Sequence, residues 1–289
     1  MPIAGHAESV RLAKLQARRP DWALLCGYEG EMLERLESTA RPVRRGADII
    51  MQGRTYDSIF VLAEGFALCY RIMPDGRRNV LNVSMPGDTI GYPACFFDTA
   101  LYSVTALSKA VVYPISFADI AAIFRDHSRL ALTLFCSMAR HTAVLGEHVA
   151  DVGWRNAYER LAHFLLEVGT RLAAIGLSDG TTFDLPLTQA KLADVLGLSI
   201  PHVNRMLRRL REDGLIELTG PRVRIVDRPA LMALADFNES YLVRNPGERA
   251  VAHFSSCDAR RREDGGAAIA RLNTAISTAP TRQPMRNHP

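Results

Sequence analysis

Long apolar runs are missing from this chain of 289 residues. A helix that crosses a membrane needs ~20 consecutive apolar residues, and no segment of the sequence approaches that length. Residues 1–20 also lack the unbroken apolar stretch of a secretion signal. We therefore expect a soluble, cytoplasmic protein with no membrane partner.

Cysteine is scarce and badly spaced for binding metal. The 5 cysteines are far apart, with no C-x-x-C pair and no histidine at a ligand interval. This spacing argues against a zinc or iron-sulfur site, and free cysteines usually behave as small buried hydrophobes. We expect no metal site, and we expect buried thiols at these positions: Cys26, Cys69, Cys95, Cys136 and Cys257.

Enzyme motifs are absent as well. The sequence has no nucleophile elbow, no phosphate-binding glycine loop and no H-E-x-x-H pair. Serine, histidine and aspartate are plentiful, but nothing in the sequence places them together. We expect neither catalytic residues nor enzymatic activity, and no motif requires a cofactor.

What the chain does have is the composition of an ordinary folded protein. Hydrophobic residues make up 48% of it and charged residues 23%, so a sizeable core can form. The length exceeds that of one compact domain, which predicts two folded units and a tail. The formal net charge of +4 permits binding to nucleic acid without requiring it.

The spacing of apolar residues changes along the chain. Residues 8–18 and 30–38 have helical spacing, whereas residues 43–115 alternate with a period of two between turn signals such as Asp75-Gly76. Turns at intervals of about 8 to 12 residues are typical of an antiparallel barrel or sandwich. We expect an all-β, sensor-like domain here.

A long helix is predicted after the β-domain. Ser116 can cap a short helix over 117–124, and a longer helical stretch without proline begins at Ser128 and continues to about residue 150. Its apolar residues form a narrow stripe: Leu130, Leu134, Met138, Leu145 and Val149. Such a stripe packs either on a partner helix, here a second copy of the chain, or on the barrel of its own chain.

A hinge and a second helical unit follow. Gly153 interrupts the helical pattern, and Asn156 can cap a helix that continues to about residue 175. Residues 176–186 are expected to form a loop or a short strand.

The most informative segment begins at Thr188. The sequence QAKLADVL predicts a helix that ends at Gly197, and a second helix is predicted over 200–213, before Gly214. Two short helices joined by a tight glycine turn are the helix-turn-helix arrangement. The apolar residues fit the packing of two such helices: Leu192, Ala193 and Leu196 on the first, Val203, Leu207 and Leu210 on the second.

The opposite face of the second helix is rich in hydrogen-bond donors. They suit phosphates and the purine edges of a major groove: His202, Asn204, Arg205, Arg208, Arg209 and Arg211. Ser199 adds a predicted N-cap hydroxyl, and Pro201 is tolerated in the first turn. The following segment, LIELTGPRVRIVD, predicts a two-stranded wing that carries Arg222 and Arg224.

A charged helix face is often only a solvated face. Here the arginine-rich helix occurs together with a glycine turn and a basic hairpin, and residues 200–228 contain seven arginines against four acidic residues. This combination is far more specific than any single part of it, so the sequence favours DNA binding.

The segment LTQAKLADVLGLSIPHVNRMLRRLREDGLIELTGPRVRIVD closely resembles the DNA-binding domain of the Crp/Fnr family of transcription regulators. The stretch DGRRNVLNVSMPGDTIGYPACFF, the long helix and YERLAHFLL follow the family order, so the resemblance covers about residues 30–236. It implies an α+β fold with an N-terminal antiparallel β-roll sensor domain, a long dimerisation helix and a C-terminal winged helix-turn-helix. The expected parts are an N-terminal helical extension (1–29), the β-roll (30–125), the dimerisation helix (126–152), the DNA-binding domain (153–236) and a largely disordered tail (237–289).

Members of this family bind DNA as dimers, with one recognition helix in each half-site. The resemblance therefore implies a bacterial homodimer on palindromic double-stranded DNA, with RNA polymerase as a further partner. It places Ile200, Pro201 and Arg205 at the base-reading positions, and Arg205 suits guanine O6 and N7. Many relatives have an acidic residue in place of Pro201, so we expect an unfamiliar half-site. The predicted DNA-binding residues are Thr188, Gln189, Ser199, Ile200, Pro201, His202, Asn204, Arg205, Arg208, Arg209 and Arg222.

The effector side departs from the family pattern. Relatives that bind cyclic AMP use a glutamate after a glycine and an Arg-Ser pair further on, where this chain has Gly91-Tyr92 and Tyr102-Ser103. Without the arginine, a buried cyclic phosphate loses its charge-assisted hydrogen bonds, so we predict an effector other than cyclic AMP. The resemblance implies a pocket for an unidentified small molecule formed by these four residues and Leu145, unless the two tyrosines fill it.

Two alternatives stay open on the sequence alone. The same scaffold could carry heme and sense a gas or the redox state, although no histidine is marked by its spacing. A β-roll could also be a ligand-sensing regulatory module for a partner enzyme and bind no DNA.

Overall fold

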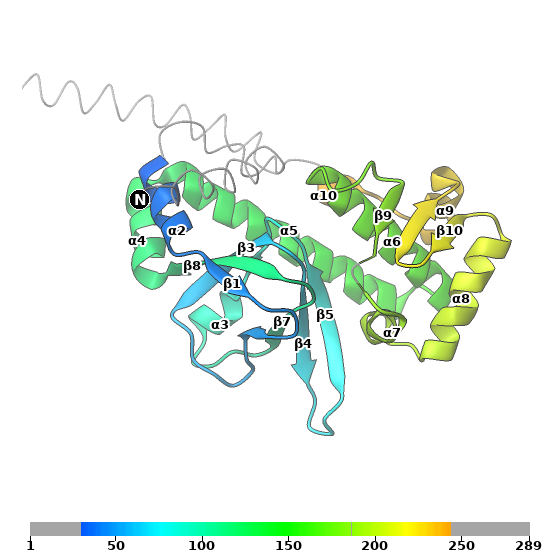
Figure 1. Cartoon of the computed structure of the whole chain (residues 1–289), viewed down its shortest axis with the longest axis horizontal. Coiled ribbons are helices and arrows are strands. Elements are labelled where there is room, and N and C mark those ends of the chain that lie inside the picture. The colour runs from blue at the N-terminus through cyan, green and yellow to red at the C-terminus, as the bar shows by residue number, and fades with distance from the viewer. Residues whose placement is uncertain (1–29, 186, 244–289) are drawn as a thin grey trace, which may run out of the picture. The chain divides into compact units, whose positions relative to one another are not determined.

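The computed structural model describes residues 30–185 and 187–243 (Figure 1). The described part begins with a short helix, α2 (Gly30–Ser38), and the strands of a β-domain follow it. These strands are β1 (Arg41–Val43), β2 (Asp48–Ile50), β3 (Ser58–Glu64), β4 (Ala67–Ile72), β5 (Arg78–Ser84), β6 (Thr89–Ile90), β7 (Ser103–Ala106) and β8 (Ala110–Ser116). The helix predicted over 8–18 lies outside the described residues.

The strands form two antiparallel sheets with the orders β1-β8-β3-β6 and β2-β7-β4-β5. Side chains from both sheets meet in one apolar cluster that includes Ile50, Phe60, Cys69, Val104 and Val112. This cluster forms because successive side chains of a strand point to opposite faces of the sheet, so that every second residue points between the two sheets. The predicted antiparallel β-roll is therefore confirmed.

Three of the cysteines lie in the described part of the chain. Cys69, Cys95 and Cys136 are free thiols and all are buried. Burial raises the pKa of the Cys95 thiol to about 11, so this group stays protonated and unreactive at neutral pH. Cys26 and Cys257 lie outside the described residues.

Three helices accompany the β-roll: α3 (Tyr92–Phe96), α4 (Phe117–Asp126) and α5 (Ser128–Gly153). The predicted cap at Ser116 is confirmed, because the backbone N–H of Asp119 donates to the Ser116 hydroxyl at 3.2 Å. The Asp119 carboxylate in turn accepts from the backbone N–H of Ser116 at 3.1 Å, which completes a capping box.

The apolar residues of α5 occupy two different faces, not one stripe. Leu130 and Leu134 are buried in a cluster with β-roll and α4 residues, so these two residues follow the alternative in which the stripe packs on the barrel of its own chain. The outward residues recur at alternating intervals of three and four, and all but Thr142 are apolar: Phe135, Met138, Thr142, Leu145, Val149 and Val152. The side chains of Val149 and Val152 are 73% and 72% exposed, which is unusual for valine in a folded domain.

The C-terminal domain begins with α6 (Ala157–Ala174), which Asn156 caps as predicted by accepting from the backbone N–H groups of Tyr158 and Glu159. The elements that follow are β9 (Thr182–Asp184), α7 (Gln189–Leu196), α8 (Ile200–Glu212), β10 (Ile216–Thr219), β11 (Arg222–Ile225), α9 (Arg228–Ala235) and α10 (Ser240–Val243). The predicted two-stranded wing has a third strand, because β9 pairs with β11 in the order β10-β11-β9.

The folded region extends past the boundary at residue 237 that the sequence suggested. Phe237 and Leu242 are buried, and α10 lies against α5 and α6. Residues 244–289 are outside the described part of the chain. Among the helices within 30–185 and 187–243, none has both the length and the apolar character needed to cross a membrane.

Candidate nucleic-acid interface

Helices α7 and α8 form the predicted helix-turn-helix. Gly197 ends α7 in the left-handed region with φ of 63°, and the backbone N–H of Leu198 donates to the Ala193 carbonyl at 2.9 Å. A glycine is favoured there because it adopts this conformation without steric cost. The predicted interhelical residues are all buried: Leu192, Ala193, Leu196, Val203, Leu207 and Leu210.

The two helices begin differently. The hydroxyl of Thr188 caps α7 by accepting from the backbone N–H of Lys191 at 3.3 Å. Ser199 stands at the N-cap of α8 but makes no side-chain cap, so its predicted capping role is wrong. The start of α8 therefore lacks a side-chain cap and suits a phosphate oxygen.

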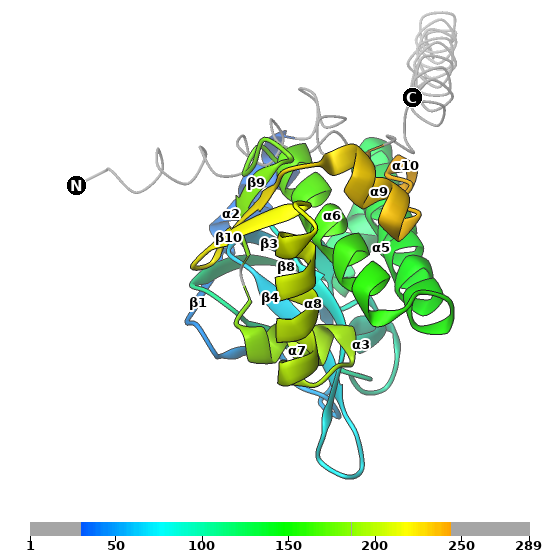
Figure 2. The same cartoon turned by 90° about the vertical axis from the view of Figure 1, so that its right-hand side faces the viewer.

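The predicted DNA-binding residues lie on an accessible surface. In Figure 2, α8 faces the viewer, with α7 below it and β10 of the wing above. His202 is half-buried, and the other predicted residues are exposed: Thr188, Gln189, Ser199, Ile200, Pro201, Asn204, Arg205, Arg208, Arg209 and Arg222.

The arginines of α8 differ in what they contact. Arg209 stacks over the ring of Tyr158 on α6 at 4.2 Å and lies 3.7 Å from Asp213, so it helps to anchor α8 on α6. For Arg205 and Arg208, the described residues provide no acidic group at ion-pair distance. These two guanidinium groups are therefore available to an external anion.

The wing arginines are paired within the wing itself. Arg222 lies 3.1 Å from the Asp184 carboxylate on β9. Arg224 donates twice to Glu217 on β10, at 2.9 and 2.7 Å. The hydrogen bonds from Arg224 lower the pKa of the Glu217 carboxyl, so this pair stays charged. DNA that contacts Arg222 has to compete with Asp184, which reduces the net positive charge of the wing.

The predicted effector-pocket residues do not form a single group. Gly91 has φ of 90°, and a Cβ added there would lie 2.7 Å from the Ile50 side chain. Tyr102 packs against the same inter-sheet cluster, and the backbone N–H of Gln52 donates to the Ser103 hydroxyl at 3.0 Å. Gly91 and Tyr102, two residues of the predicted pocket, therefore border apolar side chains of the β-roll core.

The other two residues of the predicted pocket lie along α5. The Tyr92 hydroxyl donates to the Leu134 carbonyl of α5 at 3.0 Å, which joins α3 to α5. Burial raises the pKa of Tyr92 to about 12, so the hydroxyl stays neutral. Leu145 belongs to the outward apolar residues of α5.

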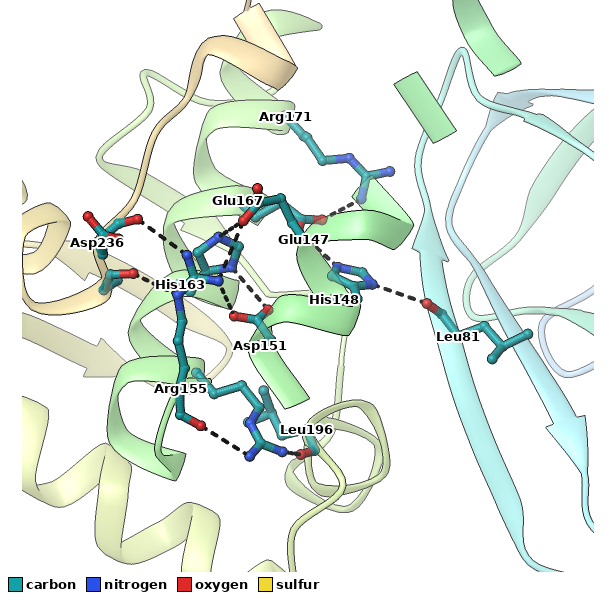
Figure 3. Close-up of polar contacts among 12 residues, drawn as sticks. Leu81, Glu147, His148, Asp151, Arg155, His163, Glu167, Arg171, Leu196 and Asp236 are labelled. Atoms are coloured by element: carbon teal, nitrogen blue, oxygen red, sulfur yellow. Dashed lines mark hydrogen bonds and ion pairs between the residues drawn. The ribbon is translucent and has the colours of Figure 1, made fainter. Parts of the chain in front are cut away.

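Sequence reasoning missed a charged cluster where α5 meets α6 (Figure 3). Its members are Glu147, His148 and Asp151 on α5, Arg155 between the two helices, and His163, Glu167 and Arg171 on α6. A signal was available, because Glu147 and Asp151, and likewise Glu167 and Arg171, are four residues apart on predicted helices.

Two family models match this chain, in the same order as the β-roll and the C-terminal domain. A model of the cyclic nucleotide-binding domain matches residues 40–127, and one of the Crp-like helix-turn-helix domain matches residues 159–234. The transcriptional activator FnrA of Stutzerimonas stutzeri is 28% identical over 207 residues, which span 71% of this chain and 84% of FnrA. The chain belongs to the Crp/Fnr family.

Further Crp/Fnr relatives show the same pattern. The nitrogen fixation regulation protein FixK of Bradyrhizobium diazoefficiens is 27% identical over 216 residues, which span 74% of this chain and 90% of FixK. The solved structure of FixK2 from Bradyrhizobium japonicum has the same fold, with a TM-score of 0.61 and 23% identity over 68% of this chain and 96% of that one. As a Crp/Fnr protein, this chain has its DNA-binding helix-turn-helix in α7 and α8, and its family is one of transcription regulators.

Proposed function

We propose that this Crp/Fnr protein is a sequence-specific regulator that binds a palindromic DNA site as a homodimer. The observation that carries the proposal is the exposed surface of α8, where Arg205 and Arg208 are available to DNA beside the exposed Ile200 and Pro201. A helix of this kind fits the major groove of B-DNA, and arginine is the usual partner of guanine there.

The proposed contacts divide into two kinds. Arg205 reads guanine through O6 and N7, and Ile200 contacts a thymine methyl group. Phosphate contacts come from Thr188 and Gln189 at the start of α7 and from backbone N–H groups in the first turn of α8, and they fix the position of the domain on the duplex.

The homodimer is supported by the outward apolar residues of α5. Their alternating spacing of three and four is that of positions a and d in a coiled coil. Small residues lie next to them at Ala139, Gly146 and Gly153, which allows a second helix to approach closely. Near the start of α5, the exposed rings of Phe124 and Phe135 make an edge-to-face pair at 5.5 Å and extend the apolar surface. An exposed apolar surface of this extent typically marks an interface.

A charge placed in this surface is expected to separate the dimer. Because Val149→Glu buries one carboxylate from each protomer near the twofold axis, the dissociation constant of the dimer should rise roughly 100-fold or more. Sedimentation equilibrium measures this change. Ala150→Glu is the matched control, since Ala150 is exposed on α5 but lies outside the a and d positions. Equal dimer stability in the two variants would contradict the proposed interface.

DNA binding itself is tested by selection from a random duplex library with the full-length protein, followed by fluorescence anisotropy. The expected product is a palindrome with half-site centres about 10 base pairs apart, one helical turn. A library without enrichment at low salt would overturn the proposed function. The protein's own promoter region is the natural first fragment for a footprint.

The β-roll is proposed to sense a signal other than cyclic AMP and to pass it to the DNA-binding domain, with RNA polymerase as the partner of the DNA-bound dimer. The support is Gly91-Tyr92 and Tyr102-Ser103 at the positions that bind phosphate in cyclic AMP-dependent relatives. A thermal-shift screen of cyclic nucleotides, oxidants and heme tests this. A rise in melting temperature with cyclic AMP would contradict it.

A further inference from the structure

His148 of α5 stands between the β-roll and α6. Its Nε2 lies 2.9 Å from a carboxylate oxygen of Glu167 on α6, and its Nδ1 lies 3.1 Å from the carbonyl oxygen of Leu81 on β5. Both neighbours are acceptors, so only an imidazolium with a proton on each nitrogen can donate to both. The contact that joins the β-roll, α5 and α6 at this point is therefore complete only when His148 is protonated.

The charges around His148 alternate. Glu167 is 1% exposed, and its second carboxylate oxygen accepts from Arg171 at 3.0 Å. Arg171 also pairs at 2.8 Å with Asp88, in the turn between β5 and β6. A protonated His148 thus completes a chain of alternating charges, and it connects α6 of the DNA-binding domain with the β-roll.

The ring of His163 lies at the same boundary (Figure 3), but unlike that of His148 it makes no hydrogen bond with the described residues. Its ring is fully buried, with Nδ1 3.2 Å from the Asp151 carboxylate and Nε2 3.6 Å from that of Glu147. Arg155 donates to the same Asp151 at 2.7 Å. Asp151 therefore lies between Arg155 and the buried ring of His163, at the boundary between α5 and α6.

We propose that the proton on His148 fastens the DNA-binding domain to the dimerisation helix and the β-roll, so that its loss loosens the connection at residues 153–156. His148 faces one acceptor on α6 and one on β5, and a neutral ring can donate to only one of them. The docked orientation of α8 is thereby linked to pH.

The direction of the pH effect follows from the surroundings of His148. Burial lowers its pKa most, but the charge of Glu167 and the hydrogen bonds to Glu167 and Leu81 together outweigh burial and raise the pKa above the ordinary value. Arg171 on α6 acts against protonation, and burial keeps the pKa of the neighbouring His141 low. Tyr241 of α10, also next to Glu167, stays neutral because burial raises its pKa. Docking is therefore strongest below the ordinary histidine pKa and weakens as pH rises through the raised pKa.

The effect on DNA rests on the proposed function. The docked domain leaves the DNA-binding face of α8 exposed, and a fixed orientation lowers the entropic cost of engaging two half-sites at once. The affinity for a full palindrome should therefore fall about tenfold between about pH 6 and about pH 8.5. A tenfold change is what the loss of one charge-assisted hydrogen bond typically causes. A duplex with one scrambled half-site should bind with little pH dependence, since it requires no fixed orientation.

The test compares His148→Gln with the wild type and with His127→Gln. Glutamine has no charge at any pH and cannot reach both acceptors, so this variant should bind the palindrome with the weaker, high-pH affinity throughout. His127, at the start of the same helix, provides the matched control, and its variant should retain the wild-type profile. His202 on α8 is present in all three proteins, so its contribution cancels.

Hydrogen exchange at one pH, about 6, gives a readout without DNA. The amides of β5 and of the turn at 85–88, which carry Leu81 and Asp88, should exchange faster in His148→Gln than in His127→Gln. Identical pH profiles for the wild type and His148→Gln, or identical exchange, would overturn the proposal. A protein that binds no DNA at any pH would instead refute the proposed function, and the exchange measurement would still decide the role of His148.

Discussion

Arg205→Ala is expected to lower the affinity for the selected palindrome by about 100-fold. Arg205 is exposed on α8, and the described residues place no acidic group at ion-pair distance from it. A bidentate arginine–guanine contact is worth roughly 1 to 3 kcal/mol, and a homodimer loses two of them. The variant should also select sites without the guanine preference of the wild type. Fluorescence anisotropy and a repeated library selection measure both effects.

Arg125→Ala is the matched control for this change. Arg125 is an exposed arginine of α4, and its guanidinium pairs with Asp126 at 2.8 Å. Its replacement by alanine also removes one positive charge, but at a position distant in sequence from the helix-turn-helix. We expect wild-type affinity and wild-type site preference from it. If Arg205→Ala behaves like Arg125→Ala, Arg205 does not read DNA.

The sequence predicted best those features that depend on neighbouring residues. The caps at Ser116 and Asn156 and the turn at Gly197 are encoded within a few residues, and all three are confirmed. The antiparallel β-roll and the buried contacts between α7 and α8 were also predictable, because apolar period and turn chemistry are local properties. The side-chain cap at Ser199 was wrong, although Ser199 does stand at the N-cap position of α8.

Features that depend on distant partners could not be predicted. Two faces of α5 are apolar, so periodicity alone could not separate Leu134, which packs inward, from Phe135, which faces out. The third strand of the wing forms because β9 pairs with β11 across an intervening helix-turn-helix. Arg171 pairs with Asp88, which is 83 residues away in the chain, and no local sequence pattern predicts such a pair.

Glu167→Gln is expected to destabilise the folded protein by about 3 kcal/mol, the loss typical of removing one partner from a buried ion pair. Glu167 is the shared acceptor of His148 and Arg171, and its removal leaves two cations facing each other in a nearly dry site. The melting temperature should fall by roughly 6 to 12 °C. Calorimetry and urea unfolding near pH 7 measure the change, and Glu34→Gln, on an exposed position of α2, should leave stability unaltered.

Acid provides an independent check on the same carboxylate. Burial alone raises the pKa of Glu167, but His148 first and Arg171 next outweigh it and lower the pKa from its ordinary value of 4.5 to about 2. A carboxyl with a lowered pKa stabilises the folded state above the ordinary value, and this contribution is lost as pH falls toward the lowered one. The difference in unfolding free energy between wild type and Glu167→Gln should therefore be largest near neutral pH and should shrink as pH falls below 4.5. If the difference is independent of pH, the variant acts through packing alone and the charge of Glu167 does not join α6 to α5.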